Sequence, residues 1–256
     1  MSEDIHQSNK QLIAKLRAAL YDCEHKQLEQ TLHDVFAADS KIHLAFPFED
    51  LDGPSGLYEK AYKPLLTALP DLERRDFIAI GSSAETGNWV GTAGYYIGVF
   101  EQPWLDIPPT KHPVVMRYCE FFRVEGEKIV EMQALWDIPQ VMMQANAWPM
   151  APSLGVEWQV PGPATLDGIV SGPFDKEKSA ASKKLVSDML ISLGKFAEGG
   201  HEAMNLGAFW HPKMTWYGPA GIGSNRRVSG FRNWHQIPFL NAMPDREGGS
   251  GYGNMT

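Results

Sequence analysis

Residues 128–144 read KIVEMQALWDIPQVMMQ, a pattern typical of a buried strand that runs into a helix. Side chains alternate along a strand, so one face of this stretch is uniformly apolar: Val130, Met132, Ala134, Trp136 and Ile138. The other face carries Ile129, Glu131, Gln133, Leu135 and Asp137. Burying an ionised carboxylate without partners costs several kcal/mol. We therefore expect Asp137 to be exposed, paired or functional.

The preceding strand adds polar groups to this picture. A two-residue turn at Glu125-Gly126 or Gly126-Glu127 would join the two strands as a hairpin. Such a turn predicts that Tyr118 and Glu120 share a face with Glu131, Gln133 and Asp137, whereas a three-residue turn reverses the pairing. A mostly apolar face with a few convergent polar groups is typical of a small-molecule site.

The rest of the first 146 residues supplies helices first and strands afterwards. Apolar spacing predicts helices at 3–25, 28–37, 57–69 and 138–146. Alternation predicts strands at 39–46, 73–80, 88–100, 114–124 and 128–137. This order indicates an α+β fold, with N-terminal helices packed on one face of a curved antiparallel sheet.

Composition narrows the class of protein. The chain has 256 residues and a formal net charge of −8, without a Lys/Arg-rich stripe, so we expect no nucleic-acid partner. The acidic start and the lack of any run near the ~18 apolar residues of a membrane span predict a cytoplasmic protein without a membrane partner. Neither the two cysteines nor the histidines have metal-ligand spacing, so no metal site is expected.

Residues 147–175 contain five prolines and four glycines, which is typical of a linker. Beyond it the sequence repeats itself at a constant offset of 174, and KPLLTALPD at 63–71 recurs as IPFLNAMPD at 237–245. The matched pairs are Phe36/Trp210, Gly56/Gly230, Pro64/Pro238, Leu66/Leu240, Ala68/Ala242, Pro70/Pro244 and Asp71/Asp245. We therefore predict a tandem duplication, with one copy at 1–146, a linker at 147–175 and a second copy at 176–256.

The second copy is shorter than the first. Thr256 corresponds to position 82 of the first copy (256 − 174), so residues 83–146, including Asp137, have no counterpart in the sequence given. Either the chain is part of a longer protein or the second copy uses a sheet from elsewhere, and we favour the former.

Three stretches carry a family resemblance: YKPLLTALPDL, GVFEQPWLDIPPTKH and FFRVEGEKIVEMQALWDIPQVMMQ. Over residues 5–146 the chain resembles the SnoaL-like polyketide cyclase branch of the nuclear transport factor 2-like superfamily, and residues 216–246 extend the resemblance. It implies a cone-shaped α+β barrel around an apolar pocket, and ring closure of an aromatic polyketide ester by aldol chemistry without metal or organic cofactor. The family's acid/base carboxylate ends an E-x5-D pattern, which here runs from Glu131 to Asp137.

Two departures concern the substrate. The family often has a Gly-Thr-His step, where this chain has GTAGYYIG with Tyr95 and Tyr96. A Trp common between the family's Glu and Asp is replaced by Gln133. These departures bear on the polyketide substrate that the resemblance implies more than on the fold.

The resulting hypothesis is an enzyme that acts on a small apolar carbonyl compound, with Asp137 as general acid/base and Tyr118 or Gln133 holding the enolate oxygen. The predicted substrate pocket also includes Glu131, Glu120, His43, Phe46, Trp104 and Tyr96. An isomerase, dehydratase or hydrolase would use the same pocket.

Two other interpretations involve no catalysis. Asp137 precedes Ile138-Pro139 and could simply cap a helix. The domain could instead be a non-catalytic ligand-binding or dimerisation module. We expect either an intramolecular pseudo-dimer or a homodimer.

Overall fold

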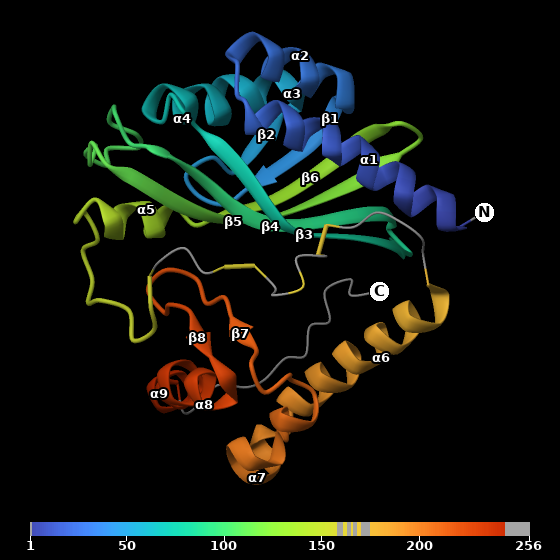
Figure 1. Cartoon of the computed structure of the whole chain (residues 1–256), viewed down its shortest axis with the longest axis vertical. Coiled ribbons are helices and arrows are strands. Elements are labelled where there is room, and N and C mark those ends of the chain that lie inside the picture. Colours follow the sequence, from blue (N-terminus) through green and yellow to red (C-terminus); the bar gives the residue numbers. More distant parts are fainter. Residues whose placement is uncertain (1, 158–160, 163–164, 166–167, 170–174, 244–256) are drawn as a thin grey trace. The chain divides into compact units, whose positions relative to one another are not determined.

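The computed structural model describes residues 2–157, 161–162, 165, 168–169 and 175–243 (Figure 1). Contacts divide the chain into two compact units. Unit 1 comprises Met1–Pro149 and Pro161–Pro173, and unit 2 comprises Met150–Val160 and Phe174–Thr256.

Unit 1 begins with a layer of helices that lies on one face of a sheet (Figure 1). The layer consists of α1 (Ser2–Tyr21), α2 (His25–Val35), α3 (Gly53–Leu57), the π-helical turn η1 (Tyr58–Tyr62) and α4 (Lys63–Ala68). Apolar residues of α1 recur three and four positions apart, so Leu12, Leu16 and Leu20 all face the core and are buried. This spacing is what the sequence predicts for the first helix.

The described residues of unit 1 form a six-stranded sheet of order β2-β1-β6-β5-β4-β3. Its strands are β1 (Phe36–Leu44), β2 (Asp50–Asp52), β3 (Glu73–Ala84), β4 (Gly87–Val99), β5 (Pro113–Glu125) and β6 (Lys128–Trp136). The predicted antiparallel sheet is wrong for one pair, because β1 runs parallel to β6. These two strands are separated by the other strands and most of the helical layer, and a connection of that length permits parallel pairing whereas a hairpin does not.

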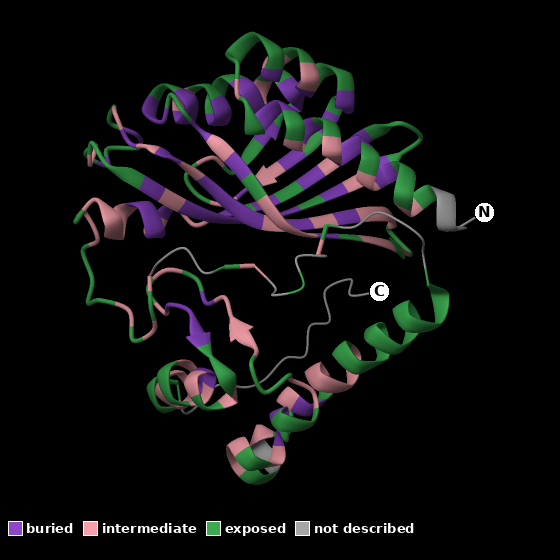
Figure 2. Cartoon of the chain, in the orientation of Figure 1, coloured by how far each residue is buried: buried purple, intermediate pink, exposed green. Residues whose placement is uncertain are grey.

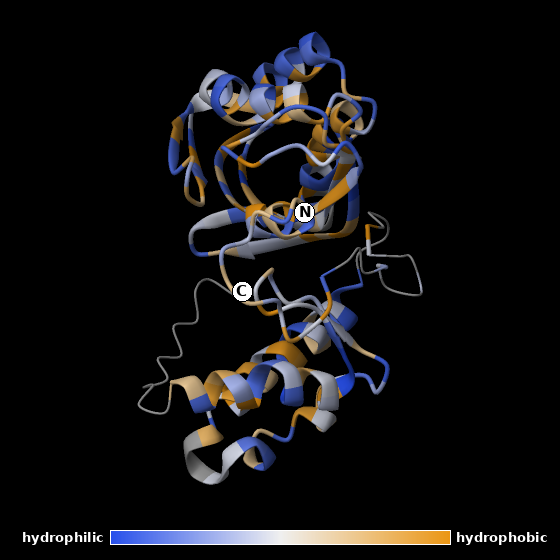
Figure 3. Cartoon of the chain, turned by 90° about the vertical axis from the view of Figure 1, so that its left-hand side faces the viewer, coloured by the Kyte–Doolittle hydropathy of each residue, from blue (hydrophilic) through white to orange (hydrophobic). Residues whose placement is uncertain are grey.

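The core of unit 1 lies between the sheet and the helices. Buried residues concentrate where these two layers meet (Figure 2), and hydrophobic bands follow the strands and helices of this unit (Figure 3). Along β6 the buried residues are Ile129, Met132, Ala134 and Trp136, while Gln133 and Leu135 are exposed. The buried residues of β6 therefore identify the side of this strand that belongs to the inner face of the sheet.

Helix α5 (Ile138–Gln144) completes the edge that β5 presents beyond the end of β6. The amide of Arg117 donates to Gln140 Oε1 at 2.8 Å, and that of Val115 donates to Gln144 Oε1 at 2.9 Å. Residues four apart share a helix face, so the two glutamines replace the missing strand partner. These bonds fix the junction at Asp137 against β5.

Unit 2 contains short elements around a small core. They are α6 (Lys176–Leu193), α7 (Phe196–Ala203), the 3-10 turn η2 (Leu206–Ala208), β7 (Thr215–Trp216), β8 (Asn225–Arg226), α8 (Arg227–Phe231), the π-helical turn η3 (Arg232–Gln236) and α9 (Ile237–Ala242). Met204, Leu206 and Phe231 are its buried apolar residues, and Trp210 and Trp216 pack against them. Most of α6 is exposed (Figure 2).

Unit 2 reproduces element bounds of unit 1 at the offset found in the sequence. Adding 174 to the bounds of α3, η1 and α4 gives those of α8, η3 and α9. The strand pairing agrees too, since Lys41↔Asp52 corresponds to Thr215↔Arg226. π-Helical turns are rare, so the recurrence of one at the same offset is specific.

Among the described residues, no helix is both long enough and apolar enough to cross a membrane.

Candidate functional site

The register between β5 and β6 decides which side chains meet inside unit 1. The predicted two-residue turn is present at Gly126-Glu127, with Glu125 opposite Lys128. Val124 then pairs with Ile129 but Arg123 pairs with Glu131, so Val130 is an extra residue in β6. Such a bulge moves every later residue of the strand to the other face relative to its partner.

Because of the bulge, the residues of β6 that share a face with Tyr118 and Glu120 differ from the predicted ones. Tyr118 lies opposite Trp136, and Glu120 lies opposite Ala134. The expected shared face of Tyr118 and Glu120 with Glu131, Gln133 and Asp137 is therefore wrong. Tyr118 and Glu120 face the core, together with Trp136.

Glu120 is the centre of a buried polar cluster, here called the interior network. Its side chain is fully buried and accepts hydrogen bonds from Arg74 Nη1 at 2.6 Å, Trp136 Nε1 at 2.9 Å and the Tyr96 hydroxyl at 3.0 Å. The Tyr96 hydroxyl also lies 3.1 Å from that of Tyr62. A buried carboxylate with this many donors is compensated for its lost hydration. The full network consists of Tyr62, Arg74, Asp76, Thr92, Tyr96, Tyr118, Glu120 and Trp136.

Arg74 joins Glu120 to a second buried carboxylate, Asp76. Arg74 Nε donates to Asp76 Oδ1 at 2.7 Å, and Arg74 Nη2 donates to Thr92 Oγ1 at 3.1 Å. The Tyr118 hydroxyl also donates to Asp76 Oδ1. The other oxygen, Oδ2, is buried and accepts no hydrogen bond, and Arg17 Nη1 lies 3.8 Å from it. Asp76 therefore has one oxygen held by two donors and one buried oxygen that accepts no hydrogen bond.

Strand alternation explains how the chain brings these groups together. Leu72 is buried immediately before β3, and Arg74 and Asp76 follow on the same face two and four residues later. Gly94 of β4 lies opposite both Asp76 and Tyr118. A Cβ on Gly94 would lie 2.5 Å from the Tyr118 hydroxyl oxygen, so glycine is needed for that hydroxyl to reach Asp76.

The charges of the network stabilise one another. Burial by itself would lower the pKa of the Arg74 guanidinium, but Glu120 and the neighbouring phenols and Asp76 hold that pKa well above its usual value. Burial, with Glu120 next in effect, raises the pKa of Tyr96 well above its usual value. Burial likewise raises the pKa values of Tyr62 and Tyr118. Arg74 is thus always charged, and the three phenols donate hydrogen bonds as neutral groups.

We expect unit 1 to lose stability above about pH 10, the ordinary tyrosine pKa. Tyr62, Tyr96 and Tyr118 have raised pKa values in the folded state. Their contribution to the free energy of unfolding is therefore complete below the pKa of the unfolded state, and it is lost as the pH rises toward the pKa of the folded state. Each such tyrosine should steepen the fall in the free energy of unfolding by about 1.4 kcal/mol per pH unit. Urea unfolding at increasing pH measures this slope. Tyr62→Phe should reduce the slope, and Tyr21→Phe, at an exposed tyrosine, should leave it unchanged. Equal slopes in wild-type protein and both variants would contradict the expectation.

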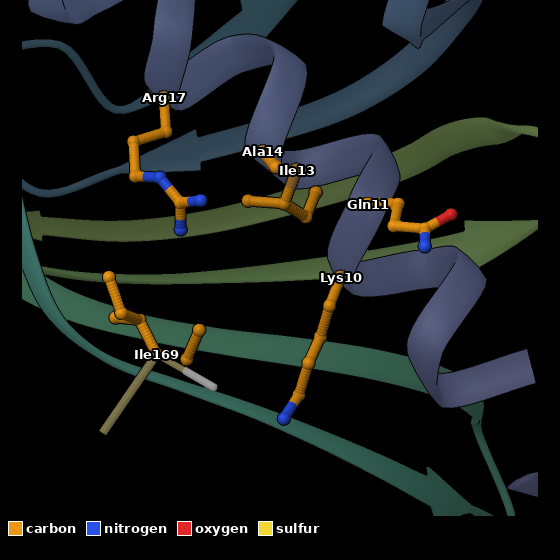
Figure 4. Close-up of a pocket in the computed structure, with 7 residues that line it drawn as sticks. Lys10, Gln11, Ile13, Ala14, Arg17 and Ile169 are labelled. Carbon is orange, nitrogen blue, oxygen red and sulfur yellow. The ribbon is translucent and has the colours of Figure 1, made fainter. Parts of the chain in front are cut away.

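A small cavity of about 40 Å³ lies between α1 and β3 (Figure 4). Its lining combines apolar and polar side chains: Lys10, Gln11, Ile13, Ala14, Arg17, Ala79 and Ile169. Arg17 connects the cavity to the interior network, because it lines the cavity and forms an ion pair with Asp76. Aromatic side chains fill the space at the other end of the network, where Trp136 packs against Phe48, Tyr62 and Tyr96 with ring centroids 5.3–5.7 Å apart.

Asp137 lies elsewhere, at the junction of β6 and α5. Its Oδ2 is 3.2 Å from both Nε and Nη2 of Arg117, and its side chain is 11% exposed. Asp137 occupies the N-cap position of α5, yet its side chain makes no capping hydrogen bond. Capping therefore does not account for the residue in this structure, and its carboxylate is held in an ion pair.

Three further predicted pocket residues lie on the outer face of the sheet. Glu131 pairs with Arg123 at 2.9 Å and accepts from Gln133 Nε2 at 2.8 Å. His43 lies opposite Gln133 in the sheet, and its Nδ1 is 2.6 Å from Asp50 Oδ1. The expectation that His43 points into the cone is wrong, because the neighbouring Ile42 and Leu44 take the inward positions.

The two remaining aromatic predictions differ in outcome. Phe46 is 81% exposed, so its predicted place in an interior pocket is wrong. Trp104 is buried and packs 6.4 Å from Phe48, in the core of unit 1. Tyr96, Tyr118 and Glu120 are thus the predicted pocket residues that the structure brings together.

Sequence reasoning missed Arg74, Asp76 and Arg17. A signal was present in the stretch LERRDF, where two charged residues occupy the strand positions that continue the inward face of Leu72. Opposite charges at inward positions of one strand, as at Arg74 and Asp76, indicate a buried ion pair.

In the described part of the chain, no group of three or more His, Cys, Asp or Glu side chains is arranged to hold a metal ion.

The helical layer and the curved mixed sheet, with a polar network on its inner face, form an α+β fold. The SnoaL-like polyketide cyclase family model matches residues 14–145, and the chain belongs to that family. No curated protein matches the chain.

Several solved structures are similar to part of the chain. A candidate SnoaL-like polyketide cyclase from Jannaschia sp. CCS1 is 16% identical, with a TM-score of 0.47 over 57% of this chain and 96% of that chain. IdmH, a candidate polyketide cyclase from Streptomyces antibioticus, is 23% identical, with a TM-score of 0.45 over 55% of this chain and 99% of that chain. AclR, a candidate hydroxylase from Streptomyces galilaeus, is 15% identical, with a TM-score of 0.47 over 56% and 87%.

Proposed function

We propose that unit 1 is a cofactor-independent enzyme that performs acid/base chemistry on a small carbonyl compound, by aldol-type cyclisation or a related proton transfer. One observation carries the proposal: Asp76 has a buried oxygen that accepts no hydrogen bond, within a network where its other oxygen is held by Arg74 and Tyr118. Desolvated carboxylates positioned in this way are effective general bases. Membership of a cyclase family supports the same class of reaction.

The proposed reaction uses Asp76 Oδ2 twice. It first takes a proton from the carbon next to a carbonyl group, and the resulting enolate carbon attacks a second carbonyl of the same molecule. The alkoxide formed in that step then takes the proton back from Asp76. Arg17, which lies beside Oδ2 and lines the cavity, supplies a positive charge for the enolate oxygen.

Asp137 is the second candidate for the base. The family resemblance nominates it through the E-x5-D pattern, and its low exposure is compatible with a site. Its carboxylate oxygen Oδ2 is already engaged by Arg117, whereas Oδ2 of Asp76 accepts no hydrogen bond. Availability of the oxygen favours Asp76.

The test is solvent-deuterium incorporation into a panel of aromatic β-keto esters and cyclic ketones. Wild-type protein should accelerate exchange at the carbon next to the carbonyl, and a variant carrying both Asp76→Asn and Asp137→Asn should not. Circular dichroism establishes that both proteins are folded. If compounds bind to wild-type protein and none exchanges faster than in buffer, a non-catalytic binding module replaces the proposal.

Unit 2 is, in this proposal, the second copy of a tandem duplication. The equal offset of three helical elements and of the strand register supports it. Gly56 and Gly230 add support, because a Cβ on either would approach equivalent residues, Leu51 and Asn225. At the same offset Gly248 and Ser250 stand in place of Arg74 and Asp76, so the proposed base has no counterpart at that position of unit 2. A crystal structure in which residues 215–242 do not superpose on 41–68 would refute the duplication.

A further inference from the structure

The helices of unit 2 correspond to the helical layer of unit 1, but they are covered less completely. In unit 1 five inward residues of this layer and of β1 are at most 1% exposed: Phe36, Ile42, Leu57, Ala61 and Leu65. At the offset of 174 their counterparts are Trp210, Trp216, Phe231, His235 and Phe239. Phe231 is buried, whereas the other four are half-buried. Figure 2 shows α8 and α9 mostly as exposed or intermediate.

Helix α6 differs from α1 in the same way. Leu12 and Leu16 of α1 are buried in the core of unit 1, where this helix packs on β3 and β4. Their counterparts on α6 are Val186, which is exposed, and Leu190, which is half-buried. A helix of a globular protein normally buries its apolar stripe, so α6 has apolar surface available for a further contact.

The five counterparts form one continuous cluster, here called the aromatic face. It consists of Trp210, Trp216, Phe231, His235 and Phe239, and the ring centroids of neighbours in it lie 4.4–5.6 Å apart. Contiguous apolar surface that remains accessible to water commonly marks an interaction site.

A polar group beside this face lacks a partner that its counterpart has. Gln236 corresponds to Tyr62, whose hydroxyl lies 3.1 Å from the Tyr96 hydroxyl on β4. Gln236 is buried, and its Oε1 accepts no hydrogen bond. Because buried amide oxygens are normally hydrogen-bonded, this oxygen indicates a donor that the described residues of unit 2 do not supply.

In unit 1 the corresponding face is covered by the sheet. Phe36 packs against Phe122 of β5 with ring centroids 6.4 Å apart, and Tyr62 packs against Trp136 of β6 at 5.3 Å. Within its described residues, unit 2 has a sheet of two strands, β7 and β8, and no strand at the position that β6 takes beside β1. A second copy of this chain does not supply the sheet, because its own β3–β6 already pack on its own helices.

We propose that the aromatic face of unit 2 is a docking surface for another polypeptide, which covers it with a curved antiparallel sheet of the type that β3–β6 form in unit 1. Such a sheet places apolar side chains against the aromatic face and a hydrogen-bond donor near Gln236 Oε1. The inference rests on the proposed duplication, which supplies the correspondence between the two units.

The test presents a sheet of this type to unit 2 of the full chain. A second copy of residues 73–146 is fused to Thr256, and hydrogen exchange of residues 227–242 is measured by mass spectrometry with and without the fused segment. Exchange should slow by about 100-fold, the effect of an effective concentration about 100 times the dissociation constant. Unchanged exchange in the fused protein would overturn the docking surface.

Two substitutions in unit 2 of the fused protein provide a matched pair. Leu240 corresponds to Leu66, which is buried in unit 1, whereas Trp234 corresponds to the exposed Lys60. Leu240→Asp should abolish the slowing, because it places a charge beneath the sheet, and Trp234→Asp should retain it. Equal exchange in the two variants would contradict the proposal.

A third variant leaves unit 2 unaltered. Phe122→Asp in the fused segment alone should also abolish the slowing, because Phe122 is the residue that covers Phe36 in unit 1. Slowing that persists in this variant would show that the fused segment does not cover unit 2 as β5 covers unit 1, and would overturn the proposal.

Sedimentation of the unfused chain tests another occupant. A dimer that Leu240→Asp dissociates and Trp234→Asp retains would place a second copy of the chain on the aromatic face and overturn the proposal. The duplication fails separately, if residues 215–242 do not superpose on 41–68 in a crystal structure. Superposition without slowed exchange overturns the docking surface alone.

Discussion

Replacing Asp76 by Asn should lower kcat by about 10²- to 10⁴-fold, the usual contribution of a general base. KM should change little, because Asn has the shape of Asp and still accepts a hydrogen bond at the position that Arg74 and Tyr118 contact. The loss belongs to the proton transfer and not to binding, so it appears in kcat. Steady-state kinetics on the fastest-exchanging compound of the panel measure both parameters.

Asp137→Asn is the informative comparison. We expect it to retain kcat within a few fold, since Asp137 is held by Arg117 at the junction of β6 and α5. The reverse order of losses would identify Asp137 as the base and exclude Asp76. Thermal unfolding of both variants excludes a loss of folded protein as the cause. A kcat of Asp76→Asn near that of wild type would contradict the assigned role directly.

Tyr118→Phe tests how much the orientation of the Asp76 carboxylate contributes, apart from its proton transfer. It removes one of the two donors to Asp76 Oδ1 and leaves the proton-accepting oxygen in place. A smaller loss than in Asp76→Asn is expected, about 10-fold if one hydrogen bond of about 1.4 kcal/mol is lost.

Periodicity was sufficient to predict most elements of unit 1. The alternation predicts a strand at 73–80, and β3 extends over Glu73–Ala84; the turn between β5 and β6 lies at one of the two predicted places. The parallel pairing of β1 with β6 was not predictable from local pattern, because it depends on where the chain returns after the helical layer.

The site was less predictable, for one physical reason. A single extra residue, Val130, reverses the face of all later residues of β6 relative to β5. Periodicity does not reveal such a bulge here, because apolar residues stand on both faces of the strand, as Leu135 and Trp136 illustrate. The prediction therefore kept Tyr118 and Glu120 together but gave them the wrong partners from β6.

Arg74→Met should lower the free energy of unfolding of unit 1 by about 3–5 kcal/mol, the usual cost of removing one partner from a buried ion pair. Arg74 is fully buried and donates to Asp76, Glu120 and Thr92. Without it, two buried carboxylates remain close together without the cation between them. Urea unfolding of the full chain, followed by circular dichroism, measures the change.

The neighbouring arginine provides the matched control. Arg75 points outward and pairs with Glu73 at 2.8 Å, with a side chain that is 58% exposed. Exposed ion pairs contribute about 0–1 kcal/mol, so Arg75→Met should change the free energy of unfolding by less than about 1 kcal/mol. Neutralising the carboxylates as well, by adding Asp76→Asn and Glu120→Gln to Arg74→Met, should recover part of the loss, because the unpaired charges are then gone. If the triple variant is no more stable than Arg74→Met, lost packing and not buried charge explains the effect.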